Sequence, residues 1–315
     1  MTETKILFAT DLHGSETFFG KILSVTKSFR VNILLISGDL TGKAIVPIVK
    51  TDKGRYFTTF FGQNYNIGET ELPELENSIR KVGYYHFLCS REEYQDFKAE
   101  PKKVDELFDK LMQDTVDRWV SKIEEVVPND IRVIMNPGND DALVVDEALK
   151  RSKRTEYTVG KAVELDDLHS MVSCEWVNPT PWNSPRECTE QELERRLRTE
   201  MERVSDVSHL VCDFHPPPYN TTLDLAPKLR KDLQPKLFLG QPEYEHVGSK
   251  SVRKIIEQYQ PLLGLHGHIH ESASMCKLRK TICVNPGSEY NEGIMHGYLV
   301  TLTPAGVDCQ PIIGG

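Results

Sequence analysis

The fold is decided by the N-terminal stretch KILFATDLHG, residues 5–14. Its first half contains a short continuous apolar run, residues 6–9, and its second half carries Asp11 and His13 in an Asp-x-His pattern. Apolar runs of this length are typical of strands that are buried on both faces of a sheet. The stretch therefore predicts a buried strand that ends in a loop with a carboxylate and an imidazole, two common kinds of metal ligand.

The same arrangement, an apolar run followed by a polar loop, recurs further along the chain. Loops at the carboxyl ends of sheet strands are where α/β folds build their sites, so we expect these loops to converge. Apolar runs at residues 33–36, 131–135, 210–212 and 262–265 lead to Asp39, Asn139, His215 and the pair His268-x-His270.

Helical patterns lie between several of the predicted strands. Apolar residues recur at helical spacing over residues 104–126, a capping-box pattern begins a second helix at Thr189, and a third helix is expected over about residues 251–259. Alternating strands and helices predict an α/β layered fold. A length of 315 residues allows one large domain or two small ones. Because we find neither a Pro/Ser-rich linker nor an internal repeat, we expect a single domain over residues 1–315.

Residues 44–128 are less regular and are interpreted as an insertion of a hairpin and helices that decorates the main sheet. The hairpin is predicted by two apolar runs that flank a glycine-containing turn at residues 52–54. We expect the aromatic side chains Tyr56, Phe57, Phe60 and Phe61 to form the core of the insertion. The alternatives are a substrate lid or a contact between copies of the chain, which would make a homo-oligomer.

The charge balance limits the classes of partner. The chain has 38 Lys and Arg against 47 Asp and Glu, a formal net charge of −9. Proteins that bind long nucleic acids carry basic stripes, so we expect no such partner. A small phosphate-containing substrate is still compatible with the acidic chain, because bound metal ions add positive charge that the count omits.

The sequence also predicts where the protein works. No apolar run approaches the roughly 18 residues that a membrane span needs, and the N-terminus lacks the pattern of a signal peptide. The seven cysteines are scattered and contain no CxxC pair, which favours reduced thiols over disulfides or a zinc-thiolate site. We therefore expect a cytoplasmic protein with no membrane partner.

The candidate ligand types fit two divalent metal ions. Two metals roughly 3.5–4 Å apart can activate water and clamp a phosphoryl group. An isolated Asp at a strand end is usually a helix cap or a turn residue, but here the Asp, Asn and His residues recur after one predicted strand after another. In this order, Asp11-x-His13, Gly38-Asp39, Gly138-Asn139, His215 and Gly267-His268-x-His270 resemble the motifs of the calcineurin-like metallophosphoesterases.

The resemblance runs from residue 5 to about residue 303, and residues 44–128 match poorly. It implies a two-sheet β-sandwich flanked by helices. Residues 178–182, 246–249 and 285–288 are similar to the bacterial and archaeal branch of predicted phosphoesterases that is related to cyclic-nucleotide phosphodiesterases.

The resemblance also implies roles for individual residues. A bridging hydroxide between the metals would be the nucleophile, with Mn or Fe as the expected metals and Zn or Ni as alternatives. The first metal would be held by Asp11, His13, Asp39 and His270, and the second by Asp39, which bridges, together with Asn139, His215 and His268.

One position departs from the family pattern. Many members have Gly-Asn-His at the third motif, and here Asp140 replaces that histidine. Asp140 can act as a general acid only if burial or a neighbouring carboxylate such as Asp141 raises its pKa. We therefore expect phosphodiesters or activated leaving groups to be preferred over alkyl monoesters. Asn139, Asp140 and Trp182 are the candidate substrate contacts, although loop packing would equally explain Trp182.

Taken together, the sequence predicts a hydrolase that uses two metals and acts on a phosphodiester or nucleotide-like phosphoester. The alternatives are a phosphomonoesterase or phosphoprotein phosphatase, and a non-catalytic metal-binding scaffold of the same fold. Missing ligands would indicate the scaffold, and every motif position carries its ligand.

Overall fold

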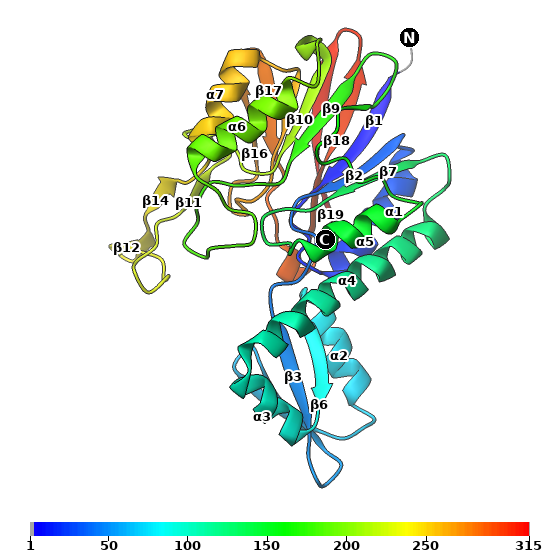
Figure 1. Cartoon of the computed structure of the whole chain (residues 1–315), viewed down its shortest axis with the longest axis vertical. Coiled ribbons are helices and arrows are strands. Elements are labelled where there is room, and N and C mark those ends of the chain that lie inside the picture. Colours follow the sequence, from blue (N-terminus) through cyan, green and yellow to red (C-terminus); the bar gives the residue numbers. More distant parts are fainter. Residues whose placement is uncertain (1–2, 315) are drawn as a thin grey trace.

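The computed structural model describes residues 3–314 (Figure 1). Met1 and Thr2, part of the segment in which no signal peptide is expected, lie outside the described residues. Two sheets form the body of the molecule, one of five and one of six strands. The first has the order β19-β18-β1-β2-β7, formed by Gly306–Gly314, Met295–Thr303, Thr4–Ala9, Ile33–Ser37 and Arg132–Asn136. The second has the order β16-β17-β15-β10-β9-β8, formed by Ser274–Leu278, Thr281–Asn285, Leu263–Leu265, Leu210–Phe214, Ser170–Cys174 and Val163–Glu164.

Strand β1 shows why its sequence is a continuous apolar run. Alternate side chains of a strand point to opposite faces of the sheet. Ile6 and Phe8 pack between the two sheets, whereas Leu7 and Ala9 pack against the helices on the outer face. Both faces are therefore buried, and the expected two-sheet sandwich is confirmed.

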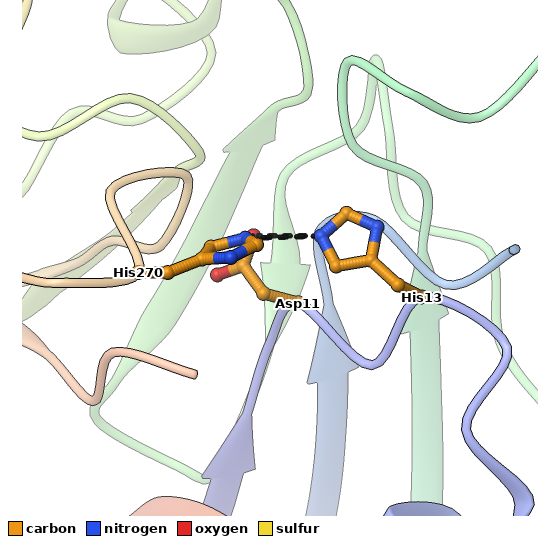
Figure 2. Close-up of side chains that lie close together, drawn as sticks. All are labelled: Asp11, His13 and His270. Atoms are coloured by element: carbon orange, nitrogen blue, oxygen red, sulfur yellow. Dashed lines mark hydrogen bonds and ion pairs between the residues drawn. The ribbon is translucent and has the colours of Figure 1, made fainter. Parts of the chain in front are cut away.

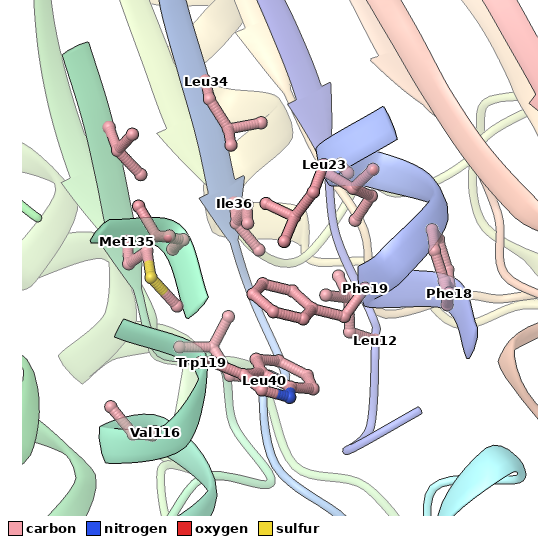
Figure 3. Packing of buried hydrophobic residues seen from close by; sticks show 14 of the residues in the cluster. Leu12, Phe18, Phe19, Leu23, Leu34, Ile36, Leu40, Val116, Trp119 and Met135 are labelled. Atoms are coloured by element: carbon pink, nitrogen blue, oxygen red, sulfur yellow. The ribbon is translucent and has the colours of Figure 1, made fainter. Parts of the chain in front are cut away.

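Helices cover the outer face of each sheet. The first sheet is covered by α1 (Glu16–Phe29), α4 (Pro101–Val126) and α5 (Val144–Arg151), and the second by α6 (Glu190–Met201) and α7 (Lys250–Tyr259). Figure 3 shows the core under α1 and α4, where the rings of Phe19 and Trp119 stack with their centroids 4.3 Å apart. The predictions of α4, α6 and α7 are confirmed.

Residues 45–99 and the start of α4 form a smaller unit with a sheet of its own. Its four strands have the order β5-β4-β3-β6, formed by Gln63–Ile67, Tyr56–Phe60, Ile45–Lys50 and Tyr85–Cys89. Helices α2 (Leu72–Lys81) and α3 (Arg91–Ala99) complete the unit, which we call the inserted sheet. It extends away from the sandwich (Figure 1).

The predicted β3–β4 hairpin is confirmed by the pairing of Val49 with Phe57. Tyr56 and Phe60 are buried in the small core of the inserted sheet, but Phe57 and Phe61 are exposed. In addition, β6 pairs with β3 in parallel. Among residues 3–314 these strands join neither main sheet, so the insertion stands beside the sandwich; the single-domain organisation stays a prediction.

A second projection, which we call the arm, spans residues 225–246. It consists of β11 (Leu225–Pro227) paired with β14 (Tyr244–His246) and of β12 (Leu237–Phe238) paired with β13 (Gln241–Pro242). Short exposed strands leave no apolar alternation, which is why the sequence does not predict the arm.

Within the described part of the chain, none of the helices has the length and apolarity that a bilayer crossing requires.

Candidate metal centre

The loops that follow five strands meet at one edge of the sandwich. β1, β2 and β7 are parallel neighbours in the first sheet, and β10 and β15 are parallel neighbours in the second. Their carboxyl ends therefore point in a common direction within each sheet. The structure brings the seven predicted metal-ligating residues to this edge, at Asp11, His13, Asp39, Asn139, His215, His268 and His270.

The first group of candidate ligands consists of Asp11, His13 and His270 (Figure 2). One potential ligand atom from each lies within 4.8 Å of the others. The Nε2 atoms of His13 and His270 are 3.0 Å apart, and Nε2 of His270 is 3.5 Å from Asp11 Oδ1. Asp11 and His13 are fully buried. Two imidazole nitrogens and a carboxylate oxygen thus face one small volume, as a metal site requires.

The second group consists of Asp39, His215 and His268, whose ligand atoms also lie within 4.8 Å of one another. Oδ2 of Asp39 is 3.5 Å from Nε2 of His215. Asn139 joins this group through its amide oxygen, which is 3.1 Å from the same nitrogen of His215. This set combines carboxylate and imidazole ligands, as the first does, and adds an amide oxygen.

Asp39 lies between the two groups. Its Oδ2 atom is 3.7 Å from Nε2 of His13 in the first group and 3.5 Å from Nε2 of His215 in the second. Asp11 also reaches toward both, since its Oδ1 atom is 3.9 Å from Nε2 of His13 and 3.9 Å from Nε2 of His215. A carboxylate in such a position can contact two cations at once.

The backbone of this edge is held in an uncommon conformation. Asp11, His13, Asp39 and His268 all have positive φ angles, of 55°, 44°, 44° and 68°. Residues other than glycine rarely occupy this left-handed region, and such residues gather at functional sites. Four of the seven candidate ligands therefore carry backbone strain that the surrounding loops maintain.

Two of the motif glycines allow the loops to approach one another. A Cβ atom at Gly138 would overlap the backbone nitrogen and the carboxylate of Asp39, and one at Gly267 would overlap the carboxylate of Asp11. Neither glycine has a positive φ angle, so it is the close approach that requires glycine here.

The ionisation states suit cation binding. Burial raises the pKa of Asp39, but the positive charge of His215 and its hydrogen bond outweigh burial and hold that pKa well below its usual range. Burial lowers the pKa of His268 to about 3, which leaves a neutral imidazole. Metal ligands must be deprotonated, so a charged carboxylate and a neutral imidazole are the forms required.

The carboxylates of the centre favour a protonated, positively charged His215. Burial lowers its pKa, but the carboxylates of Asp39 and Asp11 outweigh burial and raise it to about 9. Its Nδ1 atom and that of His13 are buried and, counting residues 3–314, have no hydrogen-bond partner. Buried carboxylates that raise the pKa of a neighbouring histidine create a negative potential, and divalent cations can neutralise that potential in place of the proton.

Comparison with known proteins agrees with this geometry. A model of the calcineurin-like phosphoesterase family matches residues 4–272. The chain belongs to the calcineurin-like phosphoesterase family. Members of this family depend on divalent metal ions, and the two Asp/His groups described above could bind such ions.

Individual relatives of the phosphoesterase fold are more distant. An uncharacterised protein of Methanocaldococcus jannaschii is 34% identical over 158 residues, which make up 50% of this chain and 64% of that protein. The chain thus matches less than two thirds of the length of this relative. The crystal structure of TT1561 of Thermus thermophilus has a TM-score of 0.55 at 12% identity, over 98% of this chain and 99% of that chain. A further crystal structure has a TM-score of 0.59 at 18% identity over the same shares, and both likenesses confirm the fold alone.

Asp140, at the position of the usual family histidine, lies at the rim of the centre. Burial and the negative charge of Asp39 raise its pKa to about 6, and Asp141 adds a smaller contribution. Its Oδ2 atom is 2.7 Å from Nζ of Lys43, a residue that sequence reasoning missed. The available signal was proximity, because Lys43 follows Asp39 by four residues in the same loop.

Asp141 and Arg186 hold the loops of the centre in place. The buried carboxylate of Asp141 accepts hydrogen bonds from the backbone nitrogens of Leu40 and Gly138, at 2.9 and 2.8 Å. The contacts of Asp141 join the loop after β2 to the loop after β7. Buried Arg186 then holds the loop after β7: its Nε atom donates to the carbonyl oxygen of Asp141, and its backbone nitrogen donates to the carbonyl oxygen of Asn139.

A cleft of about 1330 Å³ opens over the centre. Asp39, Asn139 and Asp140 line its floor, and the side chain of Trp182, 64% exposed, lines its wall. The insertion supplies one side through α4, with Val104, Phe108 and Met112, and the arm supplies another, with Arg230, Lys231 and Leu233. A second cavity, of about 1040 Å³ between α1 and α4, is lined by described residues that include none of the candidate ligands.

Proposed function

We propose that this chain is a phosphoesterase that binds two divalent metal ions and hydrolyses a phosphodiester or a nucleotide-like phosphoester. The observation that carries the proposal is the position of Asp39 between two groups of ligands, each with two buried members and one half-buried histidine. One ion would be held by Asp11, His13, Asp39 and His270, and the other by Asp39, Asn139, His215 and His268.

The metal ions, when bound, would supply a nucleophile from water at neutral pH and positive charge for the phosphoryl oxygens. The residues of the chain perform the rest. Asp11 and Asp39 are buried, so their charges act in a low-dielectric environment where they hold cations strongly. They belong to the acidic excess of the chain, and cations at this edge invert the local sign where a substrate phosphate would bind.

The cleft favours a substrate larger than a simple phosphate monoester. Its volume of about 1330 Å³ exceeds the several hundred Å³ of common small-molecule pockets. The exposed ring of Trp182 offers a stacking surface for a base or another planar group. The net charge of −9 argues against a long nucleic acid, so a small phosphoester in the cytoplasm is the substrate we propose.

The replacement of the usual histidine by Asp140 supports a preference for diesters. A protonated histidine can give its proton to a poor leaving group, whereas the carboxyl of Asp140 is engaged with Lys43. Esters with good leaving groups need this help least. We therefore expect aryl phosphodiesters to be hydrolysed faster than alkyl phosphomonoesters.

A substrate panel tests the proposal. The wild-type protein is stripped with a chelator and reloaded separately with Mn, Fe, Zn or Ni, of which Mn or Fe should give the highest activity. Each form is assayed with bis(p-nitrophenyl) phosphate, p-nitrophenyl phosphate and glycerol phosphate. We expect activity only after reloading, greatest on the diester. Equal rates on diester and alkyl monoester would contradict the diester preference, and inactivity of every form while metals are bound would favour a non-catalytic scaffold.

A further inference from the structure

Lys43 occupies a place from which it can contact a substrate phosphate. It lies in the loop after β2 that carries Asp39, and it lines the same cleft as Asp39 and Asn139. Its side chain is 38% exposed, and its Nζ atom is 2.7 Å from Oδ2 of Asp140. That same oxygen of Asp140 is 3.9 Å from Nδ1 of His13, a candidate ligand. One carboxylate therefore separates the ammonium group from the metal centre.

The other basic side chains of the cleft lie elsewhere. Arg230 and Lys231 belong to the arm, and Arg230 is paired with Asp232 at 3.2 Å. Of the Lys and Arg side chains that line the cleft in the described chain, Lys43 is the one paired with a residue of the centre.

Asp140 is fixed by contacts at both of its carboxylate oxygens. Nδ2 of Asn139 donates to Oδ1 at 2.8 Å, while Lys43 engages Oδ2. The backbone nitrogen of Asp140 also donates to Oδ1 of Asp39 at 2.8 Å. The carboxylate of Asp140 is thus fixed in position, and its contact with Nζ of Lys43 keeps the ammonium group at the cleft.

The loop of Lys43 is anchored from the inserted sheet as well. The backbone nitrogen of Gly42 donates a 2.8 Å hydrogen bond to Oη of Tyr85, at the start of β6. On its other side, the nitrogen of Thr41 donates to Asp141 at 2.8 Å. Lys43 directly follows these two anchors, so the insertion helps to set its position.

Charge explains why the pair is useful. An ionised carboxylate at position 140 alone would repel a phosphate, whereas a lysine ammonium is a compact charge that phosphate oxygens bind well. From these contacts we infer that Lys43 binds a phosphate oxygen of the substrate and that Asp140 is a positioning residue that holds Lys43. The inference rests on the proposed function, and it assigns Asp140 a role other than that of a general acid.

The inference is tested with Lys43→Met, Lys43→Arg and the matched control Lys53→Met, which lies in the exposed hairpin turn of the insertion. Metal content and thermal unfolding are measured first to confirm that each protein is loaded and folded. Binding of inorganic phosphate to the metal-loaded proteins is then measured by calorimetry. Loss of a charge-assisted contact should weaken phosphate binding about 10- to 100-fold in Lys43→Met, with partial recovery in Lys43→Arg and no change in the control.

Asp140→Asn separates a positioning role from acid catalysis. If Asp140 positions Lys43, the loss of kcat/KM is the same for aryl and alkyl leaving groups, and the double variant with Lys43→Met is no worse than Lys43→Met alone. A loss confined to poor leaving groups would overturn the inference, and so would wild-type phosphate affinity in Lys43→Met. Inactivity of the loaded wild type would instead contradict the proposed function, and the phosphate titration would still test Lys43.

Discussion

The metal-centre edge of the sandwich and the inserted sheet are stabilised in opposite ways. At the edge, Asp11 and His13 are fully buried polar residues with positive φ angles, held by contacts between loops. In the inserted sheet, Ile48 and Ile79 form a small apolar core and no described residue of that core is charged. The edge thus contains strained, charged groups that are able to bind cations. The insertion is stabilised by an apolar core and lines one side of the cleft. The hydrogen bonds between the two regions include those from Gly42 to Tyr85 and from Ser15 to Lys81.

The sharpest test of this contrast is Asp39→Ala. We expect metal binding to fall and phosphoesterase activity to drop about 1000-fold or more, because both ligand groups lose a shared carboxylate. The metal-free fold should persist, since the substitution removes a buried charge and leaves the apolar cores intact. Metal content, activity and thermal unfolding are compared with Asp52→Ala, an exposed change in the hairpin turn of the insertion. Full activity in Asp39→Ala would break the contrast.

Ile48→Ala should show the reverse behaviour. Removing a fully buried isoleucine from the inserted core should lower the free energy of unfolding by about 2–5 kcal/mol. Metal stoichiometry should not change, because the candidate ligands follow strands of the two main sheets. Denaturant unfolding and metal analysis measure both effects, with the half-exposed Leu88→Ala on β6 as the control. Loss of metal from folded Ile48→Ala would show that the two regions are not independent.

Gly138→Ala probes the close approach of the loops. The added methyl group would collide with the backbone and the carboxylate of Asp39. We therefore expect metal affinity to weaken about 10-fold or more, and the metal-free protein to lose about 1–3 kcal/mol of stability. Gly20→Ala in α1 is the control, because its Cβ meets open space. Metal titration distinguishes the two, and equal affinity in both variants would contradict the proposed crowding.

The smallest effect is expected at the junction of the two regions. Tyr85→Phe leaves the nitrogen of Gly42 without its acceptor, which should cost about 1 kcal/mol of stability. If the insertion positions Lys43, the affinity for inorganic phosphate should also fall several-fold while metal content is retained. Calorimetry with Tyr84→Phe as the neighbouring control measures this. An unchanged phosphate affinity would show that this hydrogen bond does not help to position Lys43.

Much of the edge could be predicted from the sequence because its signals are local. Each apolar run is followed directly by its Asp, Asn or His, and parallel pairing then brings the loops together. The helix α1 was missed although Ser15 caps it and accepts a hydrogen bond from the nitrogen of Phe18. The expected capping box at Thr189 forms by half, because Thr189 accepts from the nitrogen of Glu192 while the Glu192 carboxylate pairs with Arg195.

What could not be predicted depends on contacts between distant residues. Strand β6 becomes a strand by pairing with β3 across the intervening hairpin and helix, and its own sequence has no clear alternation. Lys43 is a candidate for phosphate binding because it contacts Asp140, which lies 97 residues away in the chain. Neither local periodicity nor motif spacing contains that information.

The central claim is that the loops at this edge hold two divalent ions that share Asp39. The most direct measurement is the number of Mn²⁺ ions bound per chain when chelator-stripped protein is reloaded and analysed by equilibrium dialysis, for the wild type and for Asp39→Ala. We predict two ions per wild-type chain and a loss of one or both in Asp39→Ala. No bound ion in the wild type, or two ions held with unchanged affinity by Asp39→Ala, would contradict the account.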